Sequence, residues 1–153
     1  MPRAPFQVLV YPYRKVEDGG RAYALLKRSD AGYWQAIAGG GEDDETPLAA
    51  ARREAWEEGG IPPDSNFLQL DTIESIPVTE FGDGRLWGDD IFVIPQYCFG
   101  VLVSAERIVL SREHTEYKWL TYTEAHNLVK YDGNKTAVWA LNQRLKGRGD
   151  RKG

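Results

Sequence analysis

Three glutamates at helical spacing are the residues of this chain best suited to chemistry. Glu54, Glu57 and Glu58 stand at positions i, i+3 and i+4, so a helix would project all three carboxylates from one face. Like charges at this spacing repel by roughly 0.2–0.5 kcal/mol per pair, and the last turn of a helix favours cations. Clustered carboxylate oxygens are what hard divalent cations such as Mg²⁺ or Mn²⁺ require. The alternative is a solvated acidic face with ordinary ion pairs.

The residues around these glutamates predict a short helix that follows a glycine-rich loop. Segment 39–61 reads GGGEDDETPLAAARREAWEEGGI. Thr46 is a suitable N-cap, and Pro47 suits the first helical position, where its missing N–H costs nothing. Gly59 and Gly60 supply a left-handed stop after the acidic turn. The sequence therefore places the three carboxylates on one short helix with a glycine loop beside it.

Segment 39–61 resembles the Nudix box, the signature of the Nudix hydrolases. The match comprises Gly39, Glu45 after five intervening residues, and the run REAWEEGGI at 53–61 after seven more. Ala55 departs from the pattern, because the family usually carries a larger aliphatic residue there, and this concerns packing more than chemistry. The resemblance implies a hydrolase of phosphoanhydride bonds. It also implies the α/β (α+β) fold class, as a Nudix-type α/β/α sandwich with a mixed β-sheet.

The resemblance assigns roles to individual side chains. The acidic residues that it assigns to metal binding and catalysis are Glu54, Glu57 and Glu58. The last two are then the principal metal ligands, and the first is a further ligand or the base that orients the water. Arg53 and Glu45 are expected to hold the loop against the helix, although Arg53 could instead form only a helix ion pair. The backbone carbonyl that precedes Gly39, which belongs to Ala38, is expected to join the metal shell.

A carboxylate outside the box usually completes such a site, and segment 113–120, EHTEYKWL, offers two. SREHTEYKWL, followed by YDGNKTAVWAL, is similar to the C-terminal half of bacterial dihydroneopterin-triphosphate and dATP pyrophosphohydrolases. That subfamily has a Glu-His pair a few residues before a Trp-Leu pair. On this match Glu113 is the distal metal ligand or base, and Glu116 is the alternative. His114 either contacts phosphate or donates a structural hydrogen bond.

Apolar and β-branched runs predict strands on both sides of the acidic helix. The expected strand regions are 6–13, 21–27, 33–38, 67–78, 91–103 and 113–120. Pro95 predicts a bulge or break in the most apolar of these, because proline cannot donate to a sheet ladder. Thr123 is expected to cap a helix through Lys130, and 134–146 predicts a C-terminal helix. The two long helices should cover opposite faces of the sheet.

Length and composition bound the remaining possibilities. A chain of 153 residues suits one domain, expected at 1–147 and followed by a disordered tail at 148–153. The net charge of −4 gives no basic footprint for nucleic acid, and no apolar run approaches the roughly 20 residues that span a bilayer. The N-terminus lacks the features of a signal peptide. The single cysteine, Cys98, lies in an apolar run and predicts a buried thiol. We expect a cytoplasmic protein with a small-molecule partner and no nucleic acid or membrane partner; the sequence leaves open whether it forms a homodimer.

The expected reaction is attack of water on a (deoxy)nucleoside or dihydroneopterin triphosphate, releasing a monophosphate and pyrophosphate with Mg²⁺ (or Mn²⁺) as cofactor. The alternatives are a dinucleoside polyphosphate (Ap4A-type) or ADP-sugar hydrolase and, from another class, a non-catalytic Nudix-fold ligand sensor. The presence of every box acid favours the enzyme. The candidates for substrate binding outside the box are Tyr33, Trp34, Trp87, Glu116 and Tyr131. Trp34 could equally belong to the core, and Trp87 either covers the substrate or anchors the loop at 80–90.

Overall fold

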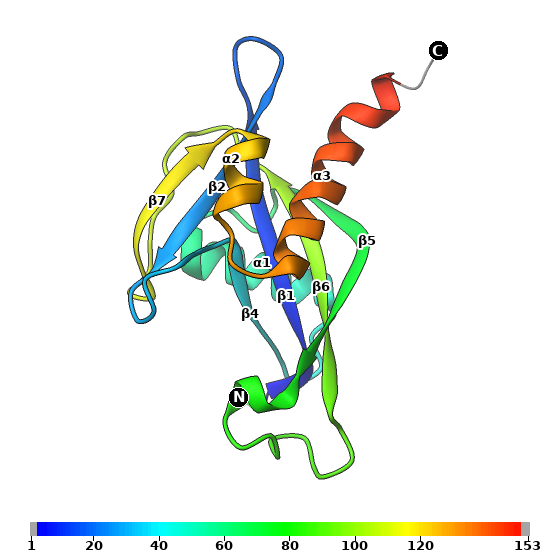
Figure 1. Cartoon of the computed structure of the whole chain (residues 1–153). Helices are drawn as coiled ribbons and strands as arrows, with labels where there is room; N and C mark the ends of the chain where they lie inside the picture. Colours follow the sequence, from blue (N-terminus) through cyan, green and yellow to red (C-terminus); the bar gives the residue numbers. More distant parts are fainter. Residues whose placement is uncertain (1–2, 151–153) are drawn as a thin grey trace.

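Seven strands form one mixed sheet between helices in the computed structural model, which describes residues 3–150, with side chains to residue 146 (Figure 1). The strands are β1 (Arg3–Lys15), β2 (Arg21–Arg28), β3 (Trp34–Gln35), β4 (Ile37–Glu42), β5 (Asn66–Pro77), β6 (Val93–Leu102) and β7 (His114–Leu120). The helices are α1 (Pro47–Gly59), α2 (Tyr122–Leu128) and α3 (Asp132–Asp150), with a 3-10 turn at Val78–Phe81. The expected α/β/α arrangement with a mixed sheet is confirmed.

The long strand β1 joins the parts of this sheet, because it pairs with three other strands. One edge of β1 runs antiparallel first to β4 and then to β2, and its other edge runs parallel to β6. β5 extends the sheet beyond β6, while β3 and β7 flank β2. Strand β4, which carries the box glycines, therefore lies at the middle of the fold.

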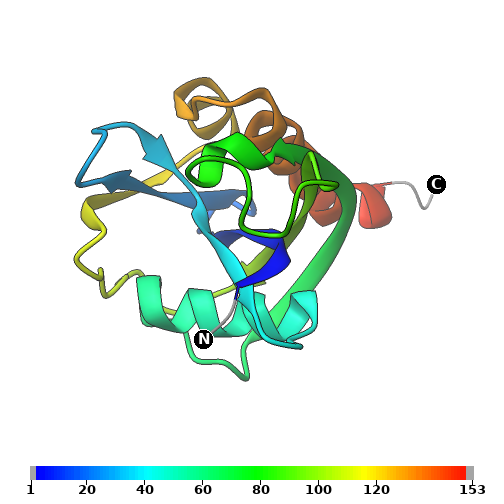
Figure 2. The ribbon, with the colours of Figure 1, turned by 90° about the horizontal axis from the view of Figure 1, so that it is seen from below.

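Two apolar cores lie on opposite faces of the sheet, as Figure 2 shows with α1 on one side and α2 and α3 on the other. The α1 core contains Val8, Val10, Ala24, Leu26, Ile37, Ala50, Ala51, Ala55, Ile61, Phe99, Val101 and Ile108. The α3 core includes Leu9, Tyr11, Tyr23, Leu25, Leu70, Cys98, Ala137, Val138 and Leu141. Helix α1 therefore packs on the sheet through three alanines, Ala50, Ala51 and Ala55.

The box glycines belong to strand β4 and do not form the expected loop. Gly39 pairs with Val8 and Gly40 with Gln7 of β1. A Cβ atom on Gly39 would overlap the carboxyl group of Glu54. These glycines therefore make room for neighbouring side chains within a regular ladder.

Strand β6 continues through Pro95, where a bulge or break was expected. Pro95 pairs with Ser75 of β5, while β1 joins β6 only from Gln96 onward. The β1-side edge of β6 is open at Pro95, so the missing N–H breaks no bond to β1. The irregularity of this ladder lies instead on β5, between Gln69 and Ile73.

The second helix begins earlier than expected, because Thr121 and not Thr123 is its cap. The Thr121 hydroxyl accepts a hydrogen bond from the Glu124 N–H, and the Glu124 carboxylate accepts one from the Thr121 N–H. This reciprocal pair is a capping box. Helix α3 continues to Asp150, into the segment 148–153 that was expected to be a disordered tail. Residues 151–153 lie outside the described part of the chain.

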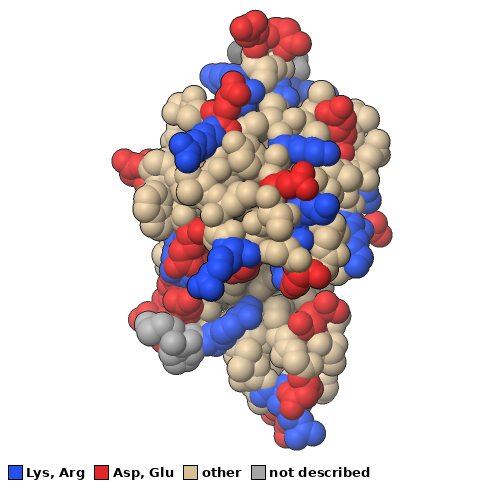
Figure 3. Space-filling model, turned by 90° about the vertical axis from the view of Figure 1, so that its left-hand side faces the viewer, with Lys and Arg blue, Asp and Glu red and all other residues tan. Residues whose placement is uncertain are grey.

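Charges of both signs are distributed over the surface. On the face that Figure 3 shows, acidic and basic side chains are intermixed among uncharged residues. Within residues 3–150, none of the helices combines the length and apolarity that crossing a bilayer requires. Cys98 is buried, as expected, and burial raises the pKa of its thiol to about 12.

Candidate active site

Helix α1 holds the predicted glutamates in a fixed register. The Thr46 hydroxyl accepts a hydrogen bond from the Ala49 N–H at 3.1 Å, and Gly60 ends the helix with a φ of 67°. Both predicted caps are confirmed. Between them, Glu54 and Glu58 turn toward the sheet and are buried, one helical turn apart.

The Arg53 guanidinium ties α1 to strand β4 and to the turn that follows it. Its Nε and Nη2 donate to the Glu45 carboxylate at 2.8 and 2.9 Å, and Nη2 also donates to the Gly40 carbonyl at 2.8 Å. Nη1 donates to Glu54 at 2.9 Å and to Glu57 at 3.3 Å. These bonds hold the pKa of Glu45 below its ordinary value. Arg53 therefore does more than form a helix ion pair, because it bridges three segments.

The Glu58 carboxylate is buried without a full set of hydrogen bonds. Only 3% of the residue is exposed, and its Oε1 atom has no hydrogen-bond partner. Burial, reinforced by the nearby carboxylates of Glu54 and Glu113, raises the pKa of Glu58 to about 10. A buried carboxylate in this state is stabilised by a proton or by a cation.

The buried imidazole of His114 faces the same carboxylate. The Gln35 side-chain nitrogen lies 3.2 Å from His114 Nε2, and an amide nitrogen only donates, so the neutral ring carries its proton on Nδ1. That atom lies 4.0 Å from Glu58 Oε1. Burial, and then the positive charge of Arg28, lowers the pKa of His114 to about 4. Two roles were considered for His114 from the sequence, a contact with phosphate and a structural hydrogen bond. The neutral ring fits the structural role.

A short turn before β7 brings Glu113 toward the helix glutamates. The Ser29 N–H donates to the Glu113 carbonyl at 2.8 Å, and the Ser29 hydroxyl donates to the Arg112 carbonyl at 2.7 Å. The Glu113 N–H in turn donates to the Ser111 hydroxyl at 3.2 Å. The end of β2 thus fixes the backbone position of Glu113.

A cleft of about 380 Å³ lies between α1, β4 and this turn. Its lining consists of Arg3, Ala38, Gly39, Gly40, Gly41, Glu42, Glu54, Glu58 and Glu113. Within residues 3–146, no three acidic, His or Cys side chains converge tightly enough to form a ready metal site. The carboxylates nevertheless fit a hard divalent cation, because the orphaned Oε1 of Glu58 and the raised pKa of that group reflect missing positive charge. The cleft therefore has the oxygen ligands that Mg²⁺ requires, but their side chains do not yet converge on one point.

Two of the predicted acidic residues lie outside the cleft lining. Glu57 is an exposed neighbour that pairs with Arg53, and just over half of its side chain, 54%, is accessible. Glu116 is also exposed and lies 3.7 Å from the Lys27 ammonium on the β2–β7 ladder. Of the two candidates for the distal carboxylate, the structure brings Glu113, and not Glu116, to the helix glutamates.

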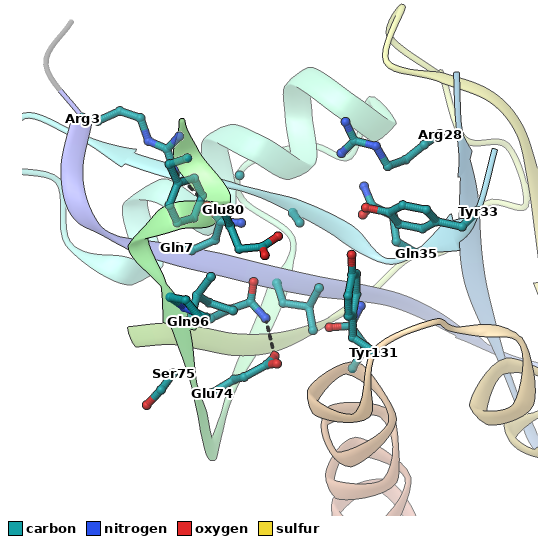
Figure 4. Close-up of a pocket in the computed structure, with 18 residues that line it drawn as sticks. Arg3, Gln7, Arg28, Tyr33, Gln35, Glu74, Ser75, Glu80, Gln96 and Tyr131 are labelled. Atoms are coloured by element: carbon teal, nitrogen blue, oxygen red, sulfur yellow. Dashed lines mark hydrogen bonds between the residues drawn. The ribbon is translucent and has the colours of Figure 1, made fainter. Parts of the chain in front are cut away.

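A larger cavity of about 520 Å³ adjoins the cleft and shares Arg3 and the β4 residues 38–40 with it (Figure 4). Tyr33 and Tyr131 line this cavity and meet edge to face, with ring centroids 5.9 Å apart. The Lys130 ammonium lies 4.8 and 5.3 Å from the two ring centroids. These two tyrosines, both candidates from the sequence, are thus placed to contact a ligand.

The two predicted tryptophans do not line either cavity. Trp34 packs against the α3 core, with the Lys118 ammonium 4.9 Å from its ring centroid. The Trp87 indole donates to the Arg3 carbonyl at 2.9 Å and meets the Phe81 ring edge to face. Of the two alternatives for Trp87, the contacts therefore support the anchor.

Several polar residues of the larger cavity were missed by sequence reasoning. They are Arg3, Gln7, Arg28, Gln35, Glu74, Gln96 and Asn134. Gln96 carried a signal, because it is an isolated polar residue within the most apolar run of the chain. Glu74 lies in a strand of alternating polar and apolar residues, where a polar residue is ordinary, so nothing in the sequence marked it as a site residue.

Comparison with known families decides the relationship, since residues 8–139 match the model of the NUDIX domain. The chain belongs to the NUDIX family. It is an enzyme of the Nudix hydrolase type, acting on phosphoanhydride bonds.

Two curated NUDIX relatives carry a substrate in their names. The chain is 32% identical over 133 residues to the dihydroneopterin triphosphate diphosphatase of Haemophilus influenzae, covering 86% of this chain and 83% of the relative. It is 30% identical over 138 residues to the dihydroneopterin triphosphate diphosphatase of Escherichia coli K12, covering 89% and 91%.

Solved structures give the same relationship. A NUDIX hydrolase structure from Listeria monocytogenes has a TM-score of 0.83 and 40% identity, covering 94% of this chain and 96% of that chain. The structure of the E. coli dihydroneopterin triphosphate pyrophosphohydrolase has a TM-score of 0.73 and 25% identity, covering 92% and 97%.

Proposed function

We propose that this NUDIX hydrolase cleaves a (deoxy)nucleoside or dihydroneopterin triphosphate to the monophosphate and pyrophosphate, with Mg²⁺ (or Mn²⁺) as its cofactor. The observation that carries this proposal is the buried, incompletely bonded carboxylate of Glu58 in a cleft that also holds Glu54 and Glu113. The two curated relatives, both named for dihydroneopterin triphosphate, support the substrate class. A cytoplasmic location stays a prediction.

The residues that would hold the cation are Glu54, Glu58 and Glu113, with the carbonyl of Ala38, whose backbone lies beside the Glu58 carboxyl group. When bound, a divalent cation supplies positive charge to the phosphate oxygens and activates water for attack. Glu57, predicted with Glu58 as a principal ligand, stays a predicted ligand, although its carboxylate pairs with Arg53 outside the cleft lining. Because burial and the neighbouring carboxylates raise the pKa of Glu58 and so favour its protonated form, binding of the cation should release a proton.

The other residues of the site have distinct tasks. Hydrolysis needs an aligned water and a group that accepts its proton, and the carboxylates of Glu54 and Glu113 are the candidates for that group. Arg53 keeps Glu54 in place through the bond at 2.9 Å, while its bonds to Glu45 and Gly40 fix the guanidinium itself. Tyr33 and Tyr131 provide the apolar surface on which a heterocycle can pack.

A product screen tests this proposal. The protein is incubated with Mg²⁺ and nucleoside triphosphates, dihydroneopterin triphosphate, dinucleoside polyphosphates and ADP-sugars, and pyrophosphate and orthophosphate are measured separately. We expect pyrophosphate from triphosphates, and an exposed-site control, Glu17→Gln, should match the wild type. Release of nucleotides from dinucleoside polyphosphates without pyrophosphate from triphosphates would replace this proposal with the longer-bridge alternative.

A further inference from the structure

Two paired side chains on neighbouring strands form a polar wall of the larger cavity, outside the carboxylate cleft. Glu74 of β5 stands directly opposite Gln96 of β6 in the ladder. The Gln96 side-chain nitrogen donates to Glu74 Oε1 at 2.9 Å, the bond drawn as a dashed line in Figure 4. Gln96 is 4% exposed, so its side chain has little freedom to leave this arrangement.

The bond leaves hydrogen-bond acceptors for a ligand. One carboxylate oxygen of Glu74 and the amide oxygen of Gln96 are not used in it, and an ionised carboxylate can only accept. Donors are also available on the same cavity, in the side-chain amides of Gln7 and Asn134. The Gln7 oxygen already accepts from Arg3 at 2.9 Å, which leaves its nitrogen to donate. The wall therefore presents adjacent acceptors with donors nearby.

The carboxyl group of Glu74 is half-buried between β5 and the start of α3. Its carboxyl group lies against Gly133, so closely that a Cβ atom there would overlap it. Gly133 belongs to the first turn of α3, and the start of a helix favours an anion. Burial raises the pKa of Glu74, Gln96 lowers it, and the negative charge of Asp132 raises it further. A ligand that donates N–H groups to this carboxylate would stabilise the anion.

We propose that Glu74, held by Gln96, selects a substrate whose ring contains a 2-aminopyrimidin-4-one unit, which is the 2-amino-6-oxo edge of guanine and the 2-amino-4-oxo edge of pterins. The adjacent ring N–H and amino N–H of that edge donate in parallel to the two oxygens of one carboxylate, and Oε1 has a second lone pair for this bond beside the one that accepts from Gln96. Adenine presents a ring acceptor beside its amino group, so it would set an acceptor against the carboxylate. This inference rests on the proposed function, because the triphosphate would extend from this ring toward the carboxylate cleft.

The two tyrosines complete the same subsite from a different side. In Figure 4 Tyr33 and Tyr131 project into the cavity from a side different from that of Glu74 and Gln96. The two rings are perpendicular, so a flat ligand ring can stack on the face of one tyrosine, with its edge free for hydrogen bonds. The volume of about 520 Å³ is that of a typical small-molecule site.

The substitution Glu74→Gln tests the inference, because the introduced amide has the shape of the carboxyl group. Its oxygen can keep the bond to Gln96, and its nitrogen replaces the second acceptor with a donor. The matched control is Asp71→Asn on the same strand, an exposed carboxylate that lies 3.4 Å from the Arg144 guanidinium. Dissociation constants are measured by calorimetry for the α,β-methylene analogues of GTP and ATP, which bind without cleavage.

We expect the wild type and Asp71→Asn to bind the guanosine analogue at least about tenfold more tightly than the adenosine analogue. Glu74→Gln should bring this ratio to about one or reverse it. Equal affinities in the wild type, or a ratio that Glu74→Gln leaves unchanged, would overturn the inference.

The binding assay separates this inference from the proposed function. A guanosine preference that depends on Glu74, without pyrophosphate release from any triphosphate, would support the ring selection and contradict the proposed hydrolysis. Pyrophosphate release with equal affinity for both analogues would do the reverse.

Discussion

Replacing Gly39 by alanine should displace the carboxylate of Glu54, to which we assign a role in the reaction, while leaving the fold intact. Gly39 lies in β4 opposite Val8, in an ordinary strand conformation that alanine can adopt. The added Cβ atom would overlap the Glu54 carboxyl group, which is the far end of a flexible side chain. That group must then move by on the order of 1 Å to regain normal contact. The substitution therefore acts on the position of the carboxylate and hardly on the backbone.

The expected magnitudes differ sharply for activity and stability. A displacement of about 1 Å in a reacting group can lower the rate by about 100-fold. For stability, losing the Arg53–Glu54 hydrogen bond costs about 1 kcal/mol. Alanine also restricts the unfolded chain, which returns about 0.4–1 kcal/mol. The net change in unfolding free energy should therefore lie within about 1 kcal/mol of zero.

The assay compares Gly39→Ala with Gly20→Ala, a glycine in the β1–β2 turn. A Cβ atom on Gly20 would meet only the side chains of Asp18 and Val16, at 3.1 and 3.6 Å. The kcat for pyrophosphate release and the unfolding free energy in urea are measured for both variants. Full activity in Gly39→Ala would refute the role given to the Glu54 position. A large loss of stability would refute the claim that only the side chain moves.

Three further predictions concern the acidic residues. In steady-state kinetics, Glu113→Gln should lower kcat by at least about tenfold, because Glu113 lines the cleft. Glu116 is exposed and pairs with Lys27, so Glu116→Gln should change kcat less than twofold. Mg²⁺ at about 100 times its Kd should stabilise the wild type by about 2.7 kcal/mol and Glu58→Gln much less, measured by thermal unfolding. Arg53 holds the pKa of Glu45 below its ordinary value of 4.5. The stabilisation from this ion pair is therefore fully present above pH 4.5, and it is lost as the pH falls through the lowered pKa of Glu45. The stability difference between wild type and Glu45→Gln, about 1 kcal/mol at pH 7, should therefore shrink below pH 4.5 in urea titrations.

Each of these predictions has a result that contradicts it. Equal kinetic effects at Glu113 and Glu116 would mean that the cleft does not identify the distal carboxylate. The same Mg²⁺ stabilisation in Glu58→Gln and wild type would place the cation elsewhere. A stability difference at Glu45 that is constant from pH 7 to pH 3 would show that its charge does not contribute.

The sequence predicted best what depends on neighbouring residues. Thr46 and Gly60 cap α1 because capping is decided within one turn of the chain, and Glu54 and Glu58 share a face because of helical spacing. The direction of that face depends on packing, so the exposure of Glu57 could not be predicted. The strand pairing of Gly39 needed knowledge of β1, which is distant in sequence.

Contacts across the sheet could be predicted least. Glu74 meets Gln96 only through the register of β5 on β6, and the bulge between Gln69 and Ile73 shifts that register by an amount that no local pattern encodes. Trp87 anchors its loop through the Arg3 carbonyl, a partner 84 residues away. Glu113 was found because the resemblance supplied a position that spacing alone could not.

The most direct test of the account is the product of triphosphate hydrolysis in the wild type and in Glu58→Gln, with Mg²⁺ and with the metal removed by chelation. The account predicts equal amounts of monophosphate and pyrophosphate from the wild type with Mg²⁺. It predicts almost none after chelation, and a kcat lower by at least about 100-fold in Glu58→Gln. Orthophosphate with a diphosphate as the products, or an undiminished rate in Glu58→Gln, would contradict it.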